Sequence, residues 1–501
     1  MIENKESNET YCAPPSSFSL LQSMRSIGYT SETAVADLVD NSITAEANEI
    51  SINFFWKGKD SFVSIEDNGH GMDHSELLNA MRIGFINPLT SRKEKDLGRF
   101  GMGLKTASIS QCKSLTVISK RKDSYPVCLR WDLDFLKEYS DKESKNDWVI
   151  LSTPGKEAKN FLNKIEELEQ GTYVVWEKLD RFCSLDFDEQ LFLDEIDKIE
   201  KHLGLIFHRF ITSKKNSIQI LINGRKVKPI DPFMINNSFT QSSPVERIKT
   251  KFGYIYIQAH ILPFVDNLTE EEIEKISWND DMANHQGFYI YRNDRLLVSG
   301  SWLGLGELRP WTKEEAYKLA RISIDLTNTT DEMWQIDIMK SKASPPSLVR
   351  NKLIQIGKIA RKKSRQTFAY RGSERHFSKE QYCPIWVTRQ SRQGQIDYKI
   401  NRDHPFVKKL LGMNRKEIHL LLSTIESCVP VRQIWIESAE GKELPDIDRS
   451  EEKINEIKEM LSSAINFYTE SGADKEDIYS YLSSMEPFCN YPEIVDCMFG
   501  R

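Results

Sequence analysis

The sequence predicts an α+β protein built from several domains. Residues 31–47 carry apolar side chains at helical spacing, and the next segments, 49–56 and 61–66, have the β-branched and aromatic composition of strands. The chain has 501 residues, which at roughly 150 residues per domain predicts about three domains. Its 68 Lys and Arg against 74 Asp and Glu give a net charge of −6, which excludes a uniformly basic nucleic-acid coat.

The cysteine pattern and the apolar runs indicate the cellular compartment in which the protein is expected. The eight cysteines lie far apart without a C-x-x-C pair, which argues against a disulfide framework and against a thiolate zinc site. No apolar run approaches the roughly 20 residues that cross a bilayer. The first 17 residues lack the basic and apolar regions of a secretory signal. We expect a cytoplasmic protein with free thiols and no membrane partner.

The first domain is expected to comprise residues 1–185. Between residues 73 and 105 the chain begins as a helix and then becomes rich in Gly, Lys and Arg. A stretch of that length inside a compact domain is typical of a functional lid. Further strands are expected at residues 114–120, 127–131, 149–152 and 173–177.

The second domain is expected to comprise residues 186–345. It opens with a helix at 187–210, and a strand at 217–222 leads into an Asn223-Gly224 turn that predicts a hairpin. Pro345 and Pro346 end the domain, and a helix follows at 348–365. Additional strands are expected at residues 254–261, 288–291, 295–298 and 322–326.

The local net charge of the C-terminal domain, residues 346–501, changes from positive to negative along the chain. Residues 340–416 hold 20 Lys and Arg against 4 Asp and Glu, whereas residues 437–501 hold 6 against 16. The basic segment includes Arg361, Lys362 and Lys363 with aromatic residues interleaved, which is typical of a surface that contacts DNA phosphates. The alternative is a solvated helix face neutralised by the acidic tail.

The first of four short motifs lies on the helix at 31–47. Asp37 and Asn41 are four residues apart and therefore share one helix face. A carboxylate can orient or deprotonate water, and an amide oxygen is a hard ligand for Mg²⁺. The pair suits a hydrolytic ATPase, although the same spacing also occurs on ordinary solvated faces.

The second motif follows the strand at 61–66. Asp67 is followed by Gly69, Gly71 and Met72. A carboxylate at a strand end can accept a hydrogen bond from an adenine amino group, and glycines let the base approach the backbone closely. The alternative is a plain Asn-Gly turn.

The third and fourth motifs are Gly98-Arg-Phe-Gly-Met-Gly-Leu-Lys105 and Gly171-Thr172. The glycines free backbone N–H groups at a helix start, where a triphosphate is favoured, and Lys105 adds a cation. The spacing fits neither the Rossmann nor the Walker pattern. Thr172, at the head of a strand, is placed to hydrogen-bond the adenine-binding carboxylate.

In their order and spacing these four motifs resemble the Bergerat nucleotide site of the GHKL ATPase superfamily. The resemblance implies an α/β sandwich that binds ATP between a helical layer and a lid. It implies Asn41 as the Mg²⁺ ligand and Asp67 as the adenine contact, backed by Thr172, with Gly69, Gly71 and Met72 lining the base pocket. The phosphate-binding lid would comprise Gly98, Arg99, Phe100, Gly101, Met102, Gly103, Leu104 and Lys105.

The resemblance also implies a catalytic carboxylate at Asp37. Hydrolytic members mostly have Glu at this position, and Asp is one methylene shorter, so the water must sit differently. Glu32 is a second carboxylate nearby in the sequence, but it lies off the same face.

The second domain resembles the S5-like transducer that follows the Bergerat domain in MutL and MORC proteins. The likeness rests on Arg292-Asn-Asp-Arg295 and on the segment from Trp334 to Pro346. A transducer lysine that senses the γ-phosphate and assists catalysis is best matched by Lys340, with Lys342 as the alternative. A C-terminal α/β extension would follow.

Together the motifs predict a Mg²⁺-dependent ATPase most like prokaryotic MORC and MutL-type proteins. No toprim or MutL endonuclease motif occurs in the sequence. ATP is expected to close a homodimer into a clamp on DNA, in defence against foreign DNA or in DNA maintenance. The alternative is a chaperone-like or scaffold ATPase that remodels proteins without binding DNA.

Overall fold

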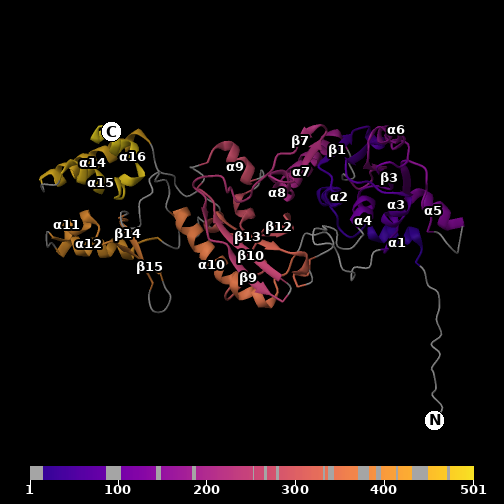
Figure 1. Cartoon of the computed structure of the whole chain (residues 1–501). Helices are drawn as coiled ribbons and strands as arrows, with labels where there is room; N and C mark the ends of the chain where they lie inside the picture. Colours follow the sequence, from indigo (N-terminus) through magenta and orange to yellow (C-terminus); the bar gives the residue numbers. More distant parts are fainter. Residues whose placement is uncertain are drawn as a thin grey trace, which may run out of the picture. The chain divides into compact units, whose positions relative to one another are not determined.

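The computed structural model divides into two compact units, residues 1–369 and residues 370–501, and each is described by itself (Figure 1). The residues that the structure describes are 15–85, 103–142, 148–182, 188–251, 253–264, 268–277, 281–330, 333–336, 343–369, 383–390, 396–412, 416–430, 450–470 and 474–501.

A seven-stranded sheet lies at the centre of the first half of unit one. Its strand order is β4-β3-β5-β2-β1-β6-β7. Neighbouring strands are antiparallel except β1 and β6, which are parallel. The strands are β1 (Glu49–Phe55), β2 (Phe62–Asp67), β3 (Ser114–Lys120), β4 (Val127–Asp132), β5 (Gly171–Glu177), β6 (Gln219–Ile222) and β7 (Arg225–Lys226).

Helices cover both faces of this sheet. Successive side chains of a strand point to opposite faces: on β2, Val63 and Ile65 join the large core, whereas Phe62 packs with Phe161 and Ile165 of α6 on the other face. The helices are α1 (Ser17–Met24), α2 (Ser31–Thr44), α3 (His74–Met81), α4 (Gly103–Gln111), α5 (Leu133–Lys142), α6 (Lys159–Glu167), α7 (Glu189–Ile206) and α8 (His208–Ile211).

Helix α2 forms where the apolar spacing predicts it. Thr30 and Thr33 cap its start reciprocally, since each side chain accepts a hydrogen bond from the backbone N–H of the other. The helix then buries the stripe that directs it onto the sheet, which consists of Ala34, Val35, Leu38 and Val39.

The first sheet extends further along the chain than the sequence predicts. Helix α7 and the β6–β7 hairpin were expected to open the second domain, but β6 pairs with β1 in parallel, with Glu49 opposite Gln219. The hairpin itself forms as predicted, with φ of 47° at Asn223 and 79° at Gly224. The expected strand at 149–152 is wrong, because only Leu151 forms a bridge, to Arg130.

A six-stranded sheet completes unit one. Its order is β12-β11-β13-β10-β8, with β9 also paired to β10. Helix α10 (Ser347–Ala369) buries Val349, Leu353 and Ile356 in the core of this sheet. The other elements are β8 (Gln241–Ser242), β9 (Glu246–Thr250), β10 (Gly253–Ile261), β11 (Gly287–Arg292), β12 (Arg295–Ser301), β13 (Ala320–Leu326) and α9 (Glu270–Ser277).

Unit two is mainly helical. Its larger core joins α14 and α15 to α16 through Leu461, Leu482 and Val495, and a smaller core contains Ile400 and Leu422. Its elements are β14 (Trp386–Gln390), β15 (Ile396–Ile400), α11 (Pro405–Gly412), α12 (Lys416–Ser427), α14 (Glu451–Glu470), α15 (Lys475–Ser483) and α16 (Pro492–Phe499).

Helices and mixed sheets together confirm the predicted α+β class. In the part of the chain that the structure describes, no helix has both the length and the apolar character needed to cross a membrane. Short 3₁₀ turns occur at η1 (Gly58–Asp60), η3 (Met282–His285), η4 (Glu315–Tyr317), η5 (Asn328–Thr330) and η6 (Phe488–Asn490).

Candidate functional site

Helix α2 carries Asp37 and Asn41, and the two differ in exposure. Asp37 is only 2% exposed, whereas Asn41 is exposed to solvent. The hydroxyl of Tyr29 donates a hydrogen bond of 2.7 Å to Oδ2 of Asp37. Burial and the charge of Asp37 raise the pKa of Tyr29, so the phenol keeps its proton. Tyr29 therefore fixes the orientation of the Asp37 carboxylate.

The start of helix α4 lies against the same carboxylate. A Cβ atom added at Gly103 would lie 3.1 Å from Oδ2 of Asp37, so the absence of a side chain allows this close approach. Gly103 and Leu104 are the described part of the third motif together with Lys105. Gly98, Arg99, Phe100, Gly101 and Met102 lie outside the described residues.

Asp67 ends strand β2 as a buried carboxylate among neutral donors. Its Oδ2 accepts a hydrogen bond of 2.9 Å from the Ser42 hydroxyl, and its Oδ1 accepts one of 3.0 Å from the backbone N–H of Gly69. Burial raises the pKa of Asp67, and the two hydrogen bonds act in the opposite direction. Ser42 follows Asn41 directly, so α2 supports the Asp67 carboxylate as well as carrying Asp37.

The two glycines after Asp67 allow close contacts that any side chain would prevent. A Cβ at Gly69 would lie 2.8 Å from Ala45, at the end of α2. Gly71 has φ of 64°, and a Cβ there would lie 1.9 Å from the carbonyl oxygen of Lys120. The segment is thus packed between α2 and β3, which the Asn-Gly turn alternative does not require.

Thr172 lies opposite Asp67 in the pairing of β2 with β5, but its hydroxyl does not bond that carboxylate. It shares a hydrogen bond of 2.9 Å with the Ser119 hydroxyl instead. Ser119 also accepts a hydrogen bond of 2.8 Å from the backbone N–H of Met72. Thr172 therefore supports the segment 69–72 indirectly, through the Ser119 hydroxyl that bonds Met72. The sequence contained no signal for Ser119.

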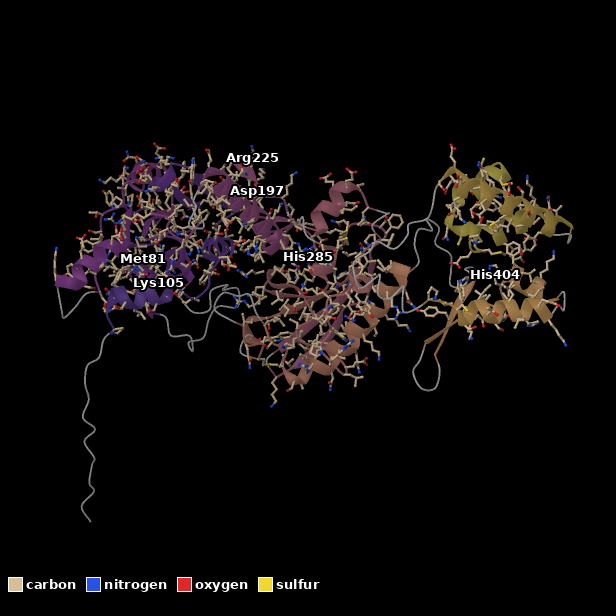
Figure 2. The ribbon with its side chains drawn as sticks, turned by 180° about the vertical axis from the view of Figure 1, so that it is seen from behind. Met81, Lys105, Asp197, Arg225, His285 and His404 are labelled. Atoms are coloured by element: carbon tan, nitrogen blue, oxygen red, sulfur yellow. The ribbon has the colours of Figure 1, made fainter. Side chains whose placement is uncertain are left out.

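Lys105 is directed to the end of helix α3. Its Nζ donates hydrogen bonds of 2.9 Å and 2.6 Å to the carbonyl oxygens of Ala80 and Arg82. Figure 2 shows Lys105 beside Met81, in the last turn of that helix. Cations at a helix C-terminus satisfy its last carbonyls. Burial lowers the pKa of Lys105 to about 8.

A cation that the sequence missed reaches α2 from the second sheet. The Nε of Arg295, the first residue of β12, donates to both carboxylate oxygens of Asp40 at 2.8 Å and 2.7 Å. Its Nη2 lies 3.9 Å from Oδ1 of Asp37. Arg295 was identified only as part of a segment with family likeness. The proposed sensing lysine, Lys340, and its alternative Lys342 lie outside the described residues.

The cations of the basic helix α10 lie in two environments, one buried and one exposed. Arg361 is buried, and its guanidinium lies 3.6 Å from the ring of Tyr317, with Trp302 and Trp311 at 5.1 Å and 5.2 Å. The expectation that Arg361 belongs to an exposed basic surface is therefore wrong, because cation–π contacts bind it to the second sheet. Lys362, Lys363 and Arg365 are exposed.

Part of the chain matches a known family of ATPases. Residues 29–172 match the family described as "Histidine kinase-, DNA gyrase B-, and HSP90-like ATPase", which confirms the resemblance to GHKL ATPases. A relative named "ATPase morc-1" from Caenorhabditis elegans is 30% identical over 89 residues. That match covers 18% of this chain and 10% of the relative, and it supports the MORC-like resemblance.

Proposed function

We propose that residues 29–172 bind ATP with Mg²⁺ and hydrolyse it. The observation that supports this most is Asp67: a buried carboxylate at a strand end, oriented by Ser42 and Gly69, beside a segment whose glycines are packed too tightly for side chains. In this proposal Asp67 accepts a hydrogen bond from the adenine amino group, and Gly69, Gly71 and Met72 border the base.

Asp37 is proposed as the residue that orients the attacking water and accepts its proton. Tyr29 holds the carboxylate in one orientation, and a carboxylate in a fixed position loses less entropy when the water binds. Glu32 is the alternative base. Burial acts to raise the pKa of Glu32, but hydrogen bonds from Thr30 and from its own backbone outweigh it, and the pKa is lowered. Those bonds favour a structural role at the start of α2.

The donor set of α2 fits Mg²⁺ held with nucleotide phosphates. Asn41 lies one helical turn after Asp37 and is exposed, so its amide oxygen can complete an oxygen coordination shell. Bound Mg²⁺ would offset phosphate charge. Lys105, Gly103 and Leu104 remain proposed parts of the phosphate-binding lid with Gly98–Met102, and Lys340 remains the proposed γ-phosphate sensor. With Nζ on the α3 carbonyls, Lys105 would need to turn to reach a phosphate.

Substituting Asp67 with Asn tests ATP binding. Asn replaces one acceptor oxygen with an NH₂ group, which faces the adenine amino group as a second donor, so ATP affinity is expected to fall by about 100-fold or more. Isothermal calorimetry with Mg²⁺ and a non-hydrolysable ATP analogue measures this. The exposed Asp60→Asn variant is the control and should bind as wild type. Unchanged affinity in Asp67→Asn contradicts the site.

DNA is proposed as a partner of the exposed face of helix α10. Lys362, Lys363 and Arg365 are exposed there, and no ion pair is recorded for them with another described residue. By contrast, Lys352 and Lys358 on the same helix pair with Glu246 and Glu307. Exposed cations on one helix suit contacts with phosphates.

The salt dependence of DNA binding tests this partner. Replacing Lys362, Lys363 and Arg365 with Gln should weaken binding and reduce the slope of log affinity against log salt by roughly 2 to 3. The control variant, Lys352→Gln with Lys358→Gln, should change the slope less. Absence of DNA binding even at low salt would favour the chaperone-like or scaffold alternative.

Assembly and setting complete the proposal. ATP is proposed to close two copies into a clamp that acts in the cytoplasm, in defence against foreign DNA or in DNA maintenance. Light scattering with and without a non-hydrolysable ATP analogue measures the mass of the particle. A doubling on nucleotide binding supports the clamp, and an unchanged monomer contradicts it.

A further inference from the structure

One guanidinium group contacts two carboxylates of helix α2. Arg295 places Nε on both oxygens of Asp40, at 2.8 Å and 2.7 Å, and Nη2 at 3.9 Å from Oδ1 of Asp37. The three side chains are 4%, 1% and 2% exposed. Water therefore screens these charges little.

Arg295 is also fixed to the strand from which it comes. Its Nη1 donates a hydrogen bond of 3.1 Å to the carbonyl oxygen of Leu296, and its guanidinium lies 5.9 Å from the ring of Phe207. The turn before it is tight, with positive φ at Asn293 and Asp294. The guanidinium thus follows the backbone of β12 rather than swinging freely.

The charges around Asp37 come from several elements. Tyr29 faces it from the segment before α2, Asp40 lies on α2 itself, and Arg295 comes from β12. Glu32 on α2 and His202 on α7 interact with each other, and Arg295 acts on His202. In this described set, Arg295 is the permanent cation nearest to Asp37.

We propose that Arg295 is a positioning residue for Asp37, and that Asp40 sets how strongly the Arg295 charge acts on it. The inference rests on the proposed function, in which Asp37 accepts a proton from water. With Asp40 present, the Arg295 charge is largely neutralised, so it acts weakly on Asp37. Because Arg295 is fixed to β12, its side chain links the second sheet to the catalytic helix.

The proposal predicts opposite shifts of the pH–rate profile for the two partners. In Asp40→Asn the uncompensated Arg295 charge stabilises ionised Asp37, so the acidic limb moves to lower pH. The maximal rate falls about tenfold, since a less basic carboxylate accepts the proton poorly. In Arg295→Gln two carboxylates remain close together, and the limb moves to higher pH. The double variant carries neither charge and returns the limb towards that of wild type.

Steady-state hydrolysis from pH 4.5 to 9 at saturating ATP measures these limbs, and calorimetry measures ATP affinity separately. ATP affinity is expected to stay within about threefold, because neither residue is placed at the nucleotide. Lys57→Gln, which breaks an ion pair with Glu157 in the first half of unit one, is the control and should leave the limb in place. Arg295→Lys keeps the charge and should restore the limb position.

A measurement independent of hydrolysis tests the link itself. Chemical unfolding of the four members of the Asp40–Arg295 cycle should show an interaction of about tenfold or more in the unfolding equilibrium constant. No interaction in that cycle, or limbs that coincide in both single variants, would overturn the proposal. If instead wild type fails to bind ATP, the proposed function is what falls, while the unfolding cycle still decides the link.

Discussion

The buried carboxylates at two regions of helix α2 differ in the partners that they contact. Asp67 contacts the end of the helix and is surrounded by neutral donors, Ser42 and Gly69. Asp37 and Asp40, five and two residues before Ser42, share the cation Arg295. A carboxylate with only neutral partners keeps acceptor strength for a ligand but is costly to bury, whereas a carboxylate paired with a cation is an internal cross-link. In the proposed function, Asp67 serves ligand recognition, whereas Asp37 and Asp40 serve catalysis and its coupling to the second sheet.

The largest expected effect concerns turnover at Asp37. Asp37→Asn keeps the shape of the side chain and can still accept the Tyr29 hydrogen bond, but it cannot accept a proton. ATP hydrolysis should fall by about 10² to 10⁴-fold, while ATP affinity stays close to wild type. Single-turnover hydrolysis and calorimetry separate the two quantities. Normal hydrolysis in Asp37→Asn, with loss in Glu32→Ala, would identify Glu32 as the base.

The same Asp-to-Asn change should have opposite effects on stability in the two regions. Asp40→Asn leaves Arg295 buried beside a neutral amide and should lower the free energy of unfolding by about 3 kcal/mol or more. Asp67→Asn should leave it equal to or above wild type at pH 7. Urea unfolding of both variants in the absence of nucleotide makes the comparison, and equal losses in both would remove the distinction.

The reason for the Asp67 result is the direction of its pKa shift. Burial raises the pKa of Asp67 in the folded state, so the charge costs stability above that pKa and the cost is relieved as pH falls through it. The stability advantage of Asp67→Asn should therefore shrink as pH is lowered from 7 towards 4. An advantage that grows on acidification contradicts this assignment.

A smaller effect is expected at Lys105, a buried cation that contacts carbonyls rather than a carboxylate. Its pKa is lowered to about 8 by burial, so the unfolded chain binds more protons between pH 8 and the ordinary lysine range. Wild-type stability should rise over that interval by about 2 to 3 kcal/mol relative to Lys105→Met. Unfolding measured at pH 7.5, 9 and 10.5 checks the slope, and parallel curves would contradict it.

Much of the fold could be predicted because helices and strands leave local patterns. Helix α2 and strand β3 lie where their periodicity places them, since apolar spacing is a property of neighbouring residues. The place of β6 could not be predicted, because its partner β1 is about 170 residues earlier and nothing local distinguishes that pairing from a hairpin in another sheet.

The candidate site divides in the same way. Asp37, Asn41 and Asp67 could be predicted as site residues because their proposed roles depend on spacing within one helix or at one strand end. The contact of Arg295 with Asp40 joins residues 255 positions apart, and only tertiary structure brings them together. Arg361 and Lys105 are of the residue types that commonly bind phosphates. In the structure, however, Arg361 contacts aromatic rings and Lys105 contacts backbone carbonyls.

Helix α10 is long and is packed against the second sheet, so a small rotation of the helix would move its far end by a large distance. Arg361 is enclosed by aromatic rings, and a Cβ at Gly357 would lie 2.5 Å from the Trp311 ring, so the helix is tightly packed where these residues lie. The helix has 23 residues, a length of about 35 Å, and a rotation of about 10° around one end therefore sweeps the other through about 6 Å. Lys362 lies 15 residues after Ser347, about 22 Å along the helix, so the same rotation about Ser347 would displace it by about 4 Å.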